Sequence, residues 1–162
     1  MTYGWRAFMD RLQEYPSGYF RLLAPCPSER IEAAERRLGA MPPTLKDMLQ
    51  HFNGAELFIA AVPMLTICGV TTVPPLSPLE WGENWYIDKL TPDWRTSGSN
   101  RDNDWAIGIM NYGGLILFNE SHGIGEWDTS ESRWLFESMV LDDWVEKVIA
   151  DGETMMAELN IR

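Results

Sequence analysis

Residues 28–54, which read SERIEAAERRLG, AMPPT and LKDMLQHFNG, are the stretch that decides the fold. In the first part, apolar side chains such as Ile31 and Leu38 recur at helical spacing and share one face. Ser28 is placed to cap the start of this helix, and Gly39 can take the left-handed conformation that ends many helices. The pattern therefore predicts an amphipathic helix with a defined start and end.

A second amphipathic helix is predicted immediately after a proline break. Pro42 and Pro43 prevent the first helix from continuing, and Thr44 can cap the next one. Asn53 and Gly54 tolerate positive φ angles, so the second helix should stop there, before strand-like residues. Apolar residues at i, i+3, i+4 and i+7 give this helix one continuous face. They are Leu45, Met48, Leu49 and Phe52. We expect the two helices to cover a sheet.

The rest of the chain predicts a helix near each end and a series of short strands between them. The first helix is expected at residues 3–15. The last helix should begin at a Ser138 cap and be interrupted at Gly152. A short helix around residues 83–90 is expected within the loops of residues 71–104. Extended segments or strands are expected at residues 19–24, 56–62, 64–70, 105–110, 115–119, 124–128 and 133–137.

This order of elements defines a fold class. A length of 162 residues suits one domain with a sizeable core. Short strands joined by tight turns favour an antiparallel sheet. We therefore predict an α+β fold, with residues 1–162 forming a single domain. In it, a mostly antiparallel sheet is flanked by the N-terminal helical pair and a C-terminal helix.

The order helix, Leu-Gly, Pro, helix, Phe-Asn-Gly and strand resembles the opening of the SUKH superfamily, the Smi/Knr-like proteins. The matching positions are Ile31, Glu35, Leu38, Gly39, Pro42, Phe52, Asn53 and Gly54. A Gly113-Gly114 turn between two strands, followed by a terminal helix, resembles the second half of the family pattern. The resemblance covers about residues 28–150, and residues 71–104 match it least.

This resemblance implies an α+β fold and a function in binding other proteins. Many bacterial members are implicated as immunity proteins that bind and neutralise toxins, often nucleases. The superfamily also includes regulatory or scaffold proteins that bind an endogenous partner. The resemblance thus implies two alternatives for this chain, toxin neutralisation or regulation.

The net charge of −11 is unevenly distributed along the chain. Residues 1–40 carry a net charge of +1, and residues 41–162 carry −12. Such a surface repels phosphate backbones, which disfavours direct binding to nucleic acid. It would attract a basic protein partner, such as a basic toxin domain, and raise the rate of association. The alternative is that the acidic residues serve solubility alone.

We expect a cytoplasmic protein with no membrane span. The first residues contain no uninterrupted apolar segment of the kind found in secretory signals. Residues 57–79 lack charged side chains, but four prolines interrupt them, so two buried strands and a loop explain them better. Cys26 and Cys68 are far apart and show no metal or redox spacing, as expected for free thiols in a reducing compartment.

Motifs for catalysis or cofactor binding are weak, so we expect no enzyme, metal or cofactor. His51 and His122 have no evident catalytic partner in the sequence. Glu126 and Asp128 lie on one face of a strand, as a glycosidase pair could, but this is also common on a polar strand face. Residues 100–104 resemble the start of an EF-hand loop without its later ligands. A hydrolase or glycosidase is the less favoured alternative.

The remaining candidate site is an aromatic and acidic segment at residues 80–105. Trp and Tyr are enriched at binding hot spots, and acidic neighbours supply steering toward a basic partner. The candidate partner-binding residues are Trp81, Glu83, Trp85, Tyr86, Asp88, Asp93, Trp94, Asp102 and Asp104. Two alternatives remain open, namely that the aromatic side chains cover one end of the sheet, or that they stack on carbohydrate.

Overall fold

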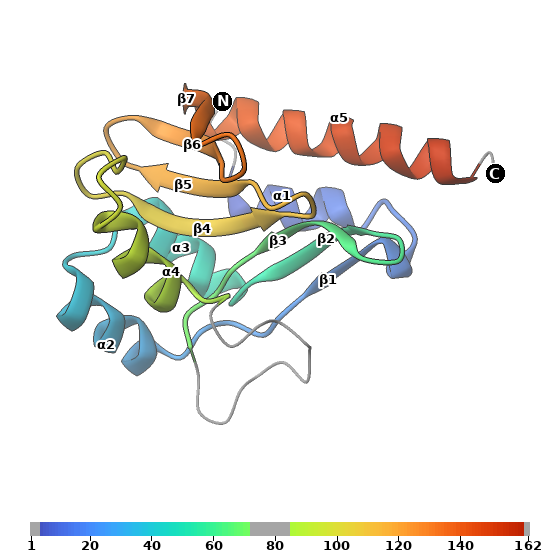
Figure 1. Ribbon diagram of the computed structural model, residues 1–162. Helices are drawn as coiled ribbons and strands as arrows, with labels where there is room; N and C mark the ends of the chain where they lie inside the picture. Colours follow the sequence, from blue (N-terminus) through green and yellow to red (C-terminus); the bar gives the residue numbers. More distant parts are fainter. Residues whose placement is uncertain (1–3, 72–84, 161–162) are drawn as a thin grey trace.

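The computed structural model describes residues 4–71 and 85–160 and has an α+β fold (Figure 1). Within these described residues, five α-helices and one 3₁₀ turn accompany a seven-stranded sheet, which confirms the predicted class. The helices are α1 (Trp5–Leu12), α2 (Ser28–Leu38), α3 (Pro43–His51), α4 (Ile87–Arg95) and α5 (Leu141–Asn160), with the 3₁₀ turn η1 at Ser17–Tyr19. The strands are β1 (Phe20–Leu22), β2 (Ala55–Ile59), β3 (Pro63–Ile67), β4 (Trp105–Met110), β5 (Leu115–Asn119), β6 (Gly123–Asp128) and β7 (Arg133–Met139).

The sheet is an antiparallel meander in which the strand order follows the chain from β1 to β7. The β4–β5 turn depends on two glycines for different reasons. Gly113 has a φ of +93°, a conformation that other residues rarely adopt. A Cβ atom on Gly114 would lie 2.7 Å from the Glu126 carboxylate and 2.8 Å from the Tyr112 ring. The backbone conformation therefore requires glycine at position 113, whereas a side chain at position 114 would have to displace the Glu126 and Tyr112 side chains.

The two faces of the sheet are covered by different helices. Phe118 of β5 belongs to the main core, which includes the apolar faces of α1, α2, α3 and α5. The adjacent residue Leu117 points the other way, into a smaller cluster with Trp94 of α4. Helix α2 packs against both α3 and α4, and Figure 1 shows it near the side of the molecule opposite α5. β4 and β5 are thus buried on both faces, whereas β7 is an edge strand with alternating exposure.

The predicted helical pair of residues 28–54 is confirmed, but its expected caps are wrong. Helix α2 begins at Ser28 and α3 at Pro43, and the N-cap positions belong to Pro27 and Pro42. Neither start has a side-chain capping bond. A proline can occupy the N-cap position without a capping bond. Its fixed φ suits the entry to a helix, and it has no backbone N–H that would be left without a hydrogen-bond acceptor. Gly39 ends α2 with a positive φ of +98°, as predicted, but its ψ of 175° is extended and not that of the expected left-handed conformation.

Asn53 and Gly54 stop α3, and Asn53 has a second role that its sequence position did not reveal. Gly54 has a φ of +106°, as its residue type predicted. The buried Asn53 amide donates to the Val70 carbonyl at 2.9 Å and accepts from the Val70 N–H at 2.7 Å. Gly69 allows this approach, because a Cβ atom there would collide with the Asn53 carbonyl. Asn53 therefore joins the end of α3 to the residues that follow β3.

Three other helices, α1, α4 and α5, differ in their extent from the prediction. Ser138 lies in β7, and α5 starts after Val140, whose carbonyl accepts the Trp144 N–H at 3.0 Å. Helix α5 continues through Gly152, where the Phe58 ring packs so closely that a Cβ atom would collide with it. The helix expected at residues 83–90 lies at residues 87–95, and α1 is shorter than residues 3–15. These boundaries follow from packing rather than from local sequence.

Candidate protein-binding surface

Asp104, one of the predicted partner-binding residues, is fully buried and serves the fold. Its carboxylate accepts hydrogen bonds from Trp94 Nε1 at 2.9 Å and from Asn119 Nδ2 at 3.0 Å. It also accepts the backbone N–H of Arg101 at 2.7 Å and its Nε–H at 2.9 Å. Four donors from α4, the following loop and β5 therefore converge on one carboxylate. Asp104 fixes the loop of residues 96–104 against the sheet.

Trp94 is also buried and forms an aromatic cluster on the second face of the sheet. Its ring lies 5.3 Å from that of Trp127 and 5.6 Å from that of Trp134, both in edge-to-face geometry. The Arg101 guanidinium lies 4.7 Å above the Trp134 ring, in a cation–π arrangement. For Trp94 the alternative reading holds, because its ring covers the sheet.

Asp88 is the third predicted surface residue that proves to be buried. Its Oδ1 atom accepts the backbone N–H of Thr71 at 2.9 Å and the Thr71 hydroxyl at 3.0 Å. Arg37 of α2 lies 3.8 Å from its other oxygen. Burial thus corrects the expected exposure of Asp88, Trp94 and Asp104. The reason is that their polar atoms find partners inside the protein.

The other candidates divide into exposed residues and residues outside the described part of the chain. Asp93 and Asp102 are exposed, Trp85 is 37% exposed, and Tyr86 is half-buried. These four lie around the start and end of α4 and remain candidates for contact with a partner. Trp81 and Glu83 lie outside the described residues.

A larger acidic surface lies on the C-terminal third of the chain, which we call the C-terminal acidic face. Residues 120–160 contain eleven Asp or Glu and two Lys or Arg, a net charge of −9. Among these acidic side chains only Glu126 is buried. The exposed ones come from the β5–β6 turn, the β6–β7 turn, β7 and α5, namely Glu120, Glu131, Glu137, Asp143, Glu146, Asp151, Glu153 and Glu158. Residues 120–160 therefore account for most of the protein's net charge of −11.

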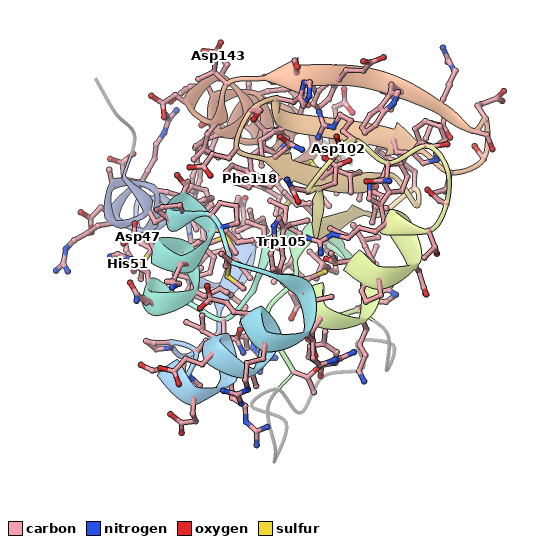
Figure 2. All side chains as sticks on the ribbon, turned by 90° about the vertical axis from the view of Figure 1, so that its left-hand side faces the viewer. Asp47, His51, Asp102, Trp105, Phe118 and Asp143 are labelled. Atoms are coloured by element: carbon pink, nitrogen blue, oxygen red, sulfur yellow. The ribbon has the colours of Figure 1, made fainter. Side chains whose placement is uncertain are left out.

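A cleft of about 750 Å³ opens beside this face. The starts of α1, α3 and α5 contribute to its wall, together with the β5–β6 turn. Figure 2 looks onto this side, with Asp47 and His51 on α3, Phe118 on β5 and Asp143 at the start of α5. The lining is mostly apolar, and its carboxylates are Asp47, Glu120 and Asp142. The cleft thus combines an apolar interior with acidic side chains.

Hydrogen bonds and tight packing hold the walls of the cleft in place. Trp5 Nε1 of α1 donates to the Thr44 carbonyl of α3 at 3.0 Å, which joins two of the helix starts. In the β5–β6 turn, Asn119 Oδ1 accepts the backbone N–H groups of Ser121 at 2.9 Å and His122 at 3.2 Å. Gly123 has a φ of +76°, and a Cβ atom there would collide with a backbone carbonyl of β7. The walls are therefore preformed.

Glu126 and Asp128 do not act as the carboxylate pair that their spacing allows. Glu126 is buried and accepts a hydrogen bond from the Tyr112 hydroxyl. Burial raises the pKa of Glu126, and it also raises that of Tyr112, helped by this hydrogen bond. Asp128 instead accepts bonds from the Ser130 hydroxyl and backbone in the β6–β7 turn, and these lower its pKa. The two carboxyl groups have separate structural roles.

The described residues offer no group of three or more His, Cys, Asp or Glu side chains placed to hold a metal ion. His51 Nδ1 lies 2.8 Å from the Asp47 carbonyl, and His122 is exposed in a turn. Cys26 and Cys68 are buried free thiols, and burial raises their pKa values to about 11 and about 12. Thiols with such values are poor nucleophiles at neutral pH. Within the described chain, every helix is too short or too polar for a bilayer span.

The sequence contained a signal for the C-terminal acidic face but none for the cleft. Counting charges over residues 120–160 would have located the excess of negative charge, and Figure 1 shows β6, β7 and α5 in the same upper part of the molecule. The cleft joins residues from both ends and the middle of the chain, such as Trp5, Asp47 and Glu120. No local pattern connects such distant positions.

Comparison with known proteins identifies the family. No curated protein matches this chain. A family model does match, described as the SMI1 / KNR4 family (SUKH-1), over residues 25–147. The matched residues run from the approach to α2 into α5 and include the whole sheet except β1. Because the match covers well over half of its length, this chain belongs to the SMI1 / KNR4 family (SUKH-1).

Proposed function

We propose that this protein is a non-catalytic binding protein of the immunity type, which neutralises a basic toxin domain in the bacterial cytoplasm. The observation that carries the proposal is the C-terminal acidic face, with a net charge of −9 over residues 120–160. Membership of the SMI1 / KNR4 family (SUKH-1) supports a role in protein binding. The partner would be a protein with a basic surface, such as a nuclease.

The mechanism is occlusion. A nuclease must present a basic groove to the phosphate backbone of its substrate. An acidic protein surface can cover that groove, compete with nucleic acid and block access to the catalytic residues. The eight exposed carboxylates, of which Glu146 and Asp151 also pair with Arg11 and Lys147, would provide the complementary field. A stable complex would bury about 800 Å² on each partner.

Electrostatic steering would also make neutralisation fast. A surface of strong opposite charge raises association rates by about 10- to 1,000-fold at low salt. Speed matters for an inhibitor that must act before the toxin finds its substrate. The association rate should therefore fall markedly between low and physiological ionic strength, because exposed charges are screened over about 8–10 Å. A salt-independent rate would mean that the acidic face serves solubility only.

The direct test is co-expression with the toxin encoded by the neighbouring gene. We expect cells that express both proteins to grow, and the two proteins to elute together from a sizing column. Growth arrest with no complex would overturn the proposal. A gene that stands alone, together with capture of a basic endogenous protein, would favour the regulatory or scaffold alternative.

A further inference from the structure

The cleft beside the C-terminal acidic face has an interior suited to an apolar group. Its lining includes the buried rings of Trp5 and Phe118, with the half-buried side chains of Met139 and Leu141. Val140, at the junction of β7 and α5, is 66% exposed at the same cleft. A volume of about 750 Å³ is in the range of sites that bind small molecules, so one long side chain would fill only part of the cleft.

The charges around the cleft determine whether it favours a positively or a negatively charged group. The N-termini of α1, α3 and α5 all contribute to the lining, and each carries a partial positive charge of about half a unit. Asp47 of α3 and Glu120 of the β5–β6 turn are exposed and carry a full negative charge each. The neighbouring acidic face adds to that negative field. The carboxylates therefore outweigh the helix termini and favour a cation.

From these observations we infer that the cleft receives an arginine or lysine side chain from a basic protein partner. The aliphatic stem of that side chain packs on the apolar lining, and its charged end reaches the Asp47 and Glu120 carboxylates. Long basic side chains bury their stems in this way while their charged ends stay near polar groups. This inference rests on the proposed function and names the place where the partner is anchored.

The preformed walls make such an anchor effective. The Trp5–Thr44 hydrogen bond and the turn held by Asn119 fix the lining before a partner arrives. Little conformational entropy is then lost on binding, which favours affinity and specificity. Arginine in a well-packed pocket is among the side chains most often found at binding hot spots. The exposed acidic face would guide the partner, and the cleft would hold it.

The test uses phenethylguanidinium as a probe, with 3-phenylpropionate as the oppositely charged control. Titration of the isotope-labelled protein, followed by amide NMR, should give saturable shifts at cleft residues such as Asn119, Gly123 and Leu141. The anion should give none. The double variant Asp47→Asn, Glu120→Gln should bind the cation about tenfold more weakly, since exposed ion pairs contribute modestly and two are removed. The matched variant Asp10→Asn, Glu32→Gln changes charge equally, away from the cleft, and should bind normally.

Several results would overturn the inference. The inference is wrong if the cation causes no chemical-shift changes at cleft residues, or if the anion binds equally well. It is also wrong if the double variant at Asp47 and Glu120 binds the cation with unchanged affinity. Binding to the cognate toxin gives a separate readout. If the unmodified protein protects and the double variant binds the toxin equally well, the cleft assignment fails and the proposed function stands. If the cation binds the cleft but no protection is seen, the proposed function fails instead.

Discussion

The carboxylates of residues 85–104 and those of the C-terminal acidic face have the same chemistry and opposite roles. Asp88 and Asp104 are buried and accept hydrogen bonds from fixed donors within the fold. Eight carboxylates of residues 120–160 are exposed to solvent. A buried carboxylate with internal donors stabilises the native state. The exposed carboxylates are in contact with solvent, although Glu146, Asp151 and Glu153 also accept hydrogen bonds from Arg11, Lys147 and Tyr15. Burial therefore separates the structural carboxylates from those that remain candidates for contact with a partner.

Each region contains an exception that supports this distinction. Asp93 and Asp102 lie close in sequence to the two buried aspartates, yet both are exposed. Glu126 lies among the residues of the acidic face, yet it is buried against Tyr112. Sequence neighbourhood thus does not decide the role of a carboxylate. The following substitutions test the comparison in order of decreasing effect on stability.

Replacement of Asp104 should have the largest effect. Asp104→Ala leaves the Arg101 guanidinium, the Trp94 indole N–H and the Asn119 amide without their shared acceptor. Breaking a buried charge pair from one side costs about 4 kcal/mol, so we expect the free energy of unfolding to fall by about that amount. Urea unfolding followed by tryptophan fluorescence measures it. The nearby Asp102→Ala is the control, and equal stability of the two variants would contradict the assigned role.

Replacement of Asp88 should have a smaller effect on stability. Asp88→Ala removes the acceptor of two hydrogen bonds from Thr71, and we expect a loss of about 2 kcal/mol. Asp93→Ala on the same helix removes an exposed carboxylate and should change stability by less than about 0.5 kcal/mol. Thermal unfolding of both variants gives the comparison. Similar melting temperatures would show that Asp88 is not a structural residue.

Glu126 should make the free energy of unfolding depend on pH. Burial raises its pKa in the folded state, so the protonated form is favoured there. Its full contribution to stability is present below the pKa of the unfolded chain and is lost as pH rises through the folded-state value. Glu126→Gln cannot ionise and should gain stability relative to the unmodified protein between pH 4 and neutral pH. Unfolding curves at several pH values test this, and a constant difference between the two proteins would refute it.

Neutralisation of exposed residues of the acidic face should leave stability nearly unchanged and slow association. In the variant Glu131→Gln, Glu137→Gln, Glu158→Gln, each change should alter the free energy of unfolding by less than about 0.5 kcal/mol. The association rate with a basic toxin should fall at low salt and become less dependent on salt. Stopped-flow measurement provides the rate. The control Asp10→Asn, Glu14→Gln, Glu32→Gln changes charge equally within residues 1–40 and should associate faster than the test variant.

Much of the fold could be predicted because its elements depend on short-range patterns. Strands β4 and β5 were predicted with their exact bounds, since Asn-Tyr-Gly-Gly separates two apolar runs. The candidate site was predicted less well. Aromatic and acidic residues near α4 indicated a binding surface. Trp94 and Asp104, however, are separated by nine residues, form a hydrogen bond and are buried together. The number of available hydrogen-bond partners cannot be counted from the sequence.

The sequence by itself determined the helical stripes of α2 and α3, the glycines at positions 39, 54 and 113, the sheet-forming meander and the excess of negative charge. These features follow from the conformational preferences of neighbouring residues. Only the tertiary structure decided that Asn53 holds Val70, that Gly152 accommodates Phe58 and that three helix starts meet at one cleft. Each of these contacts joins residues far apart in the chain. Such contacts form only when the whole core packs, because packing decides which distant groups are brought together and shielded from water.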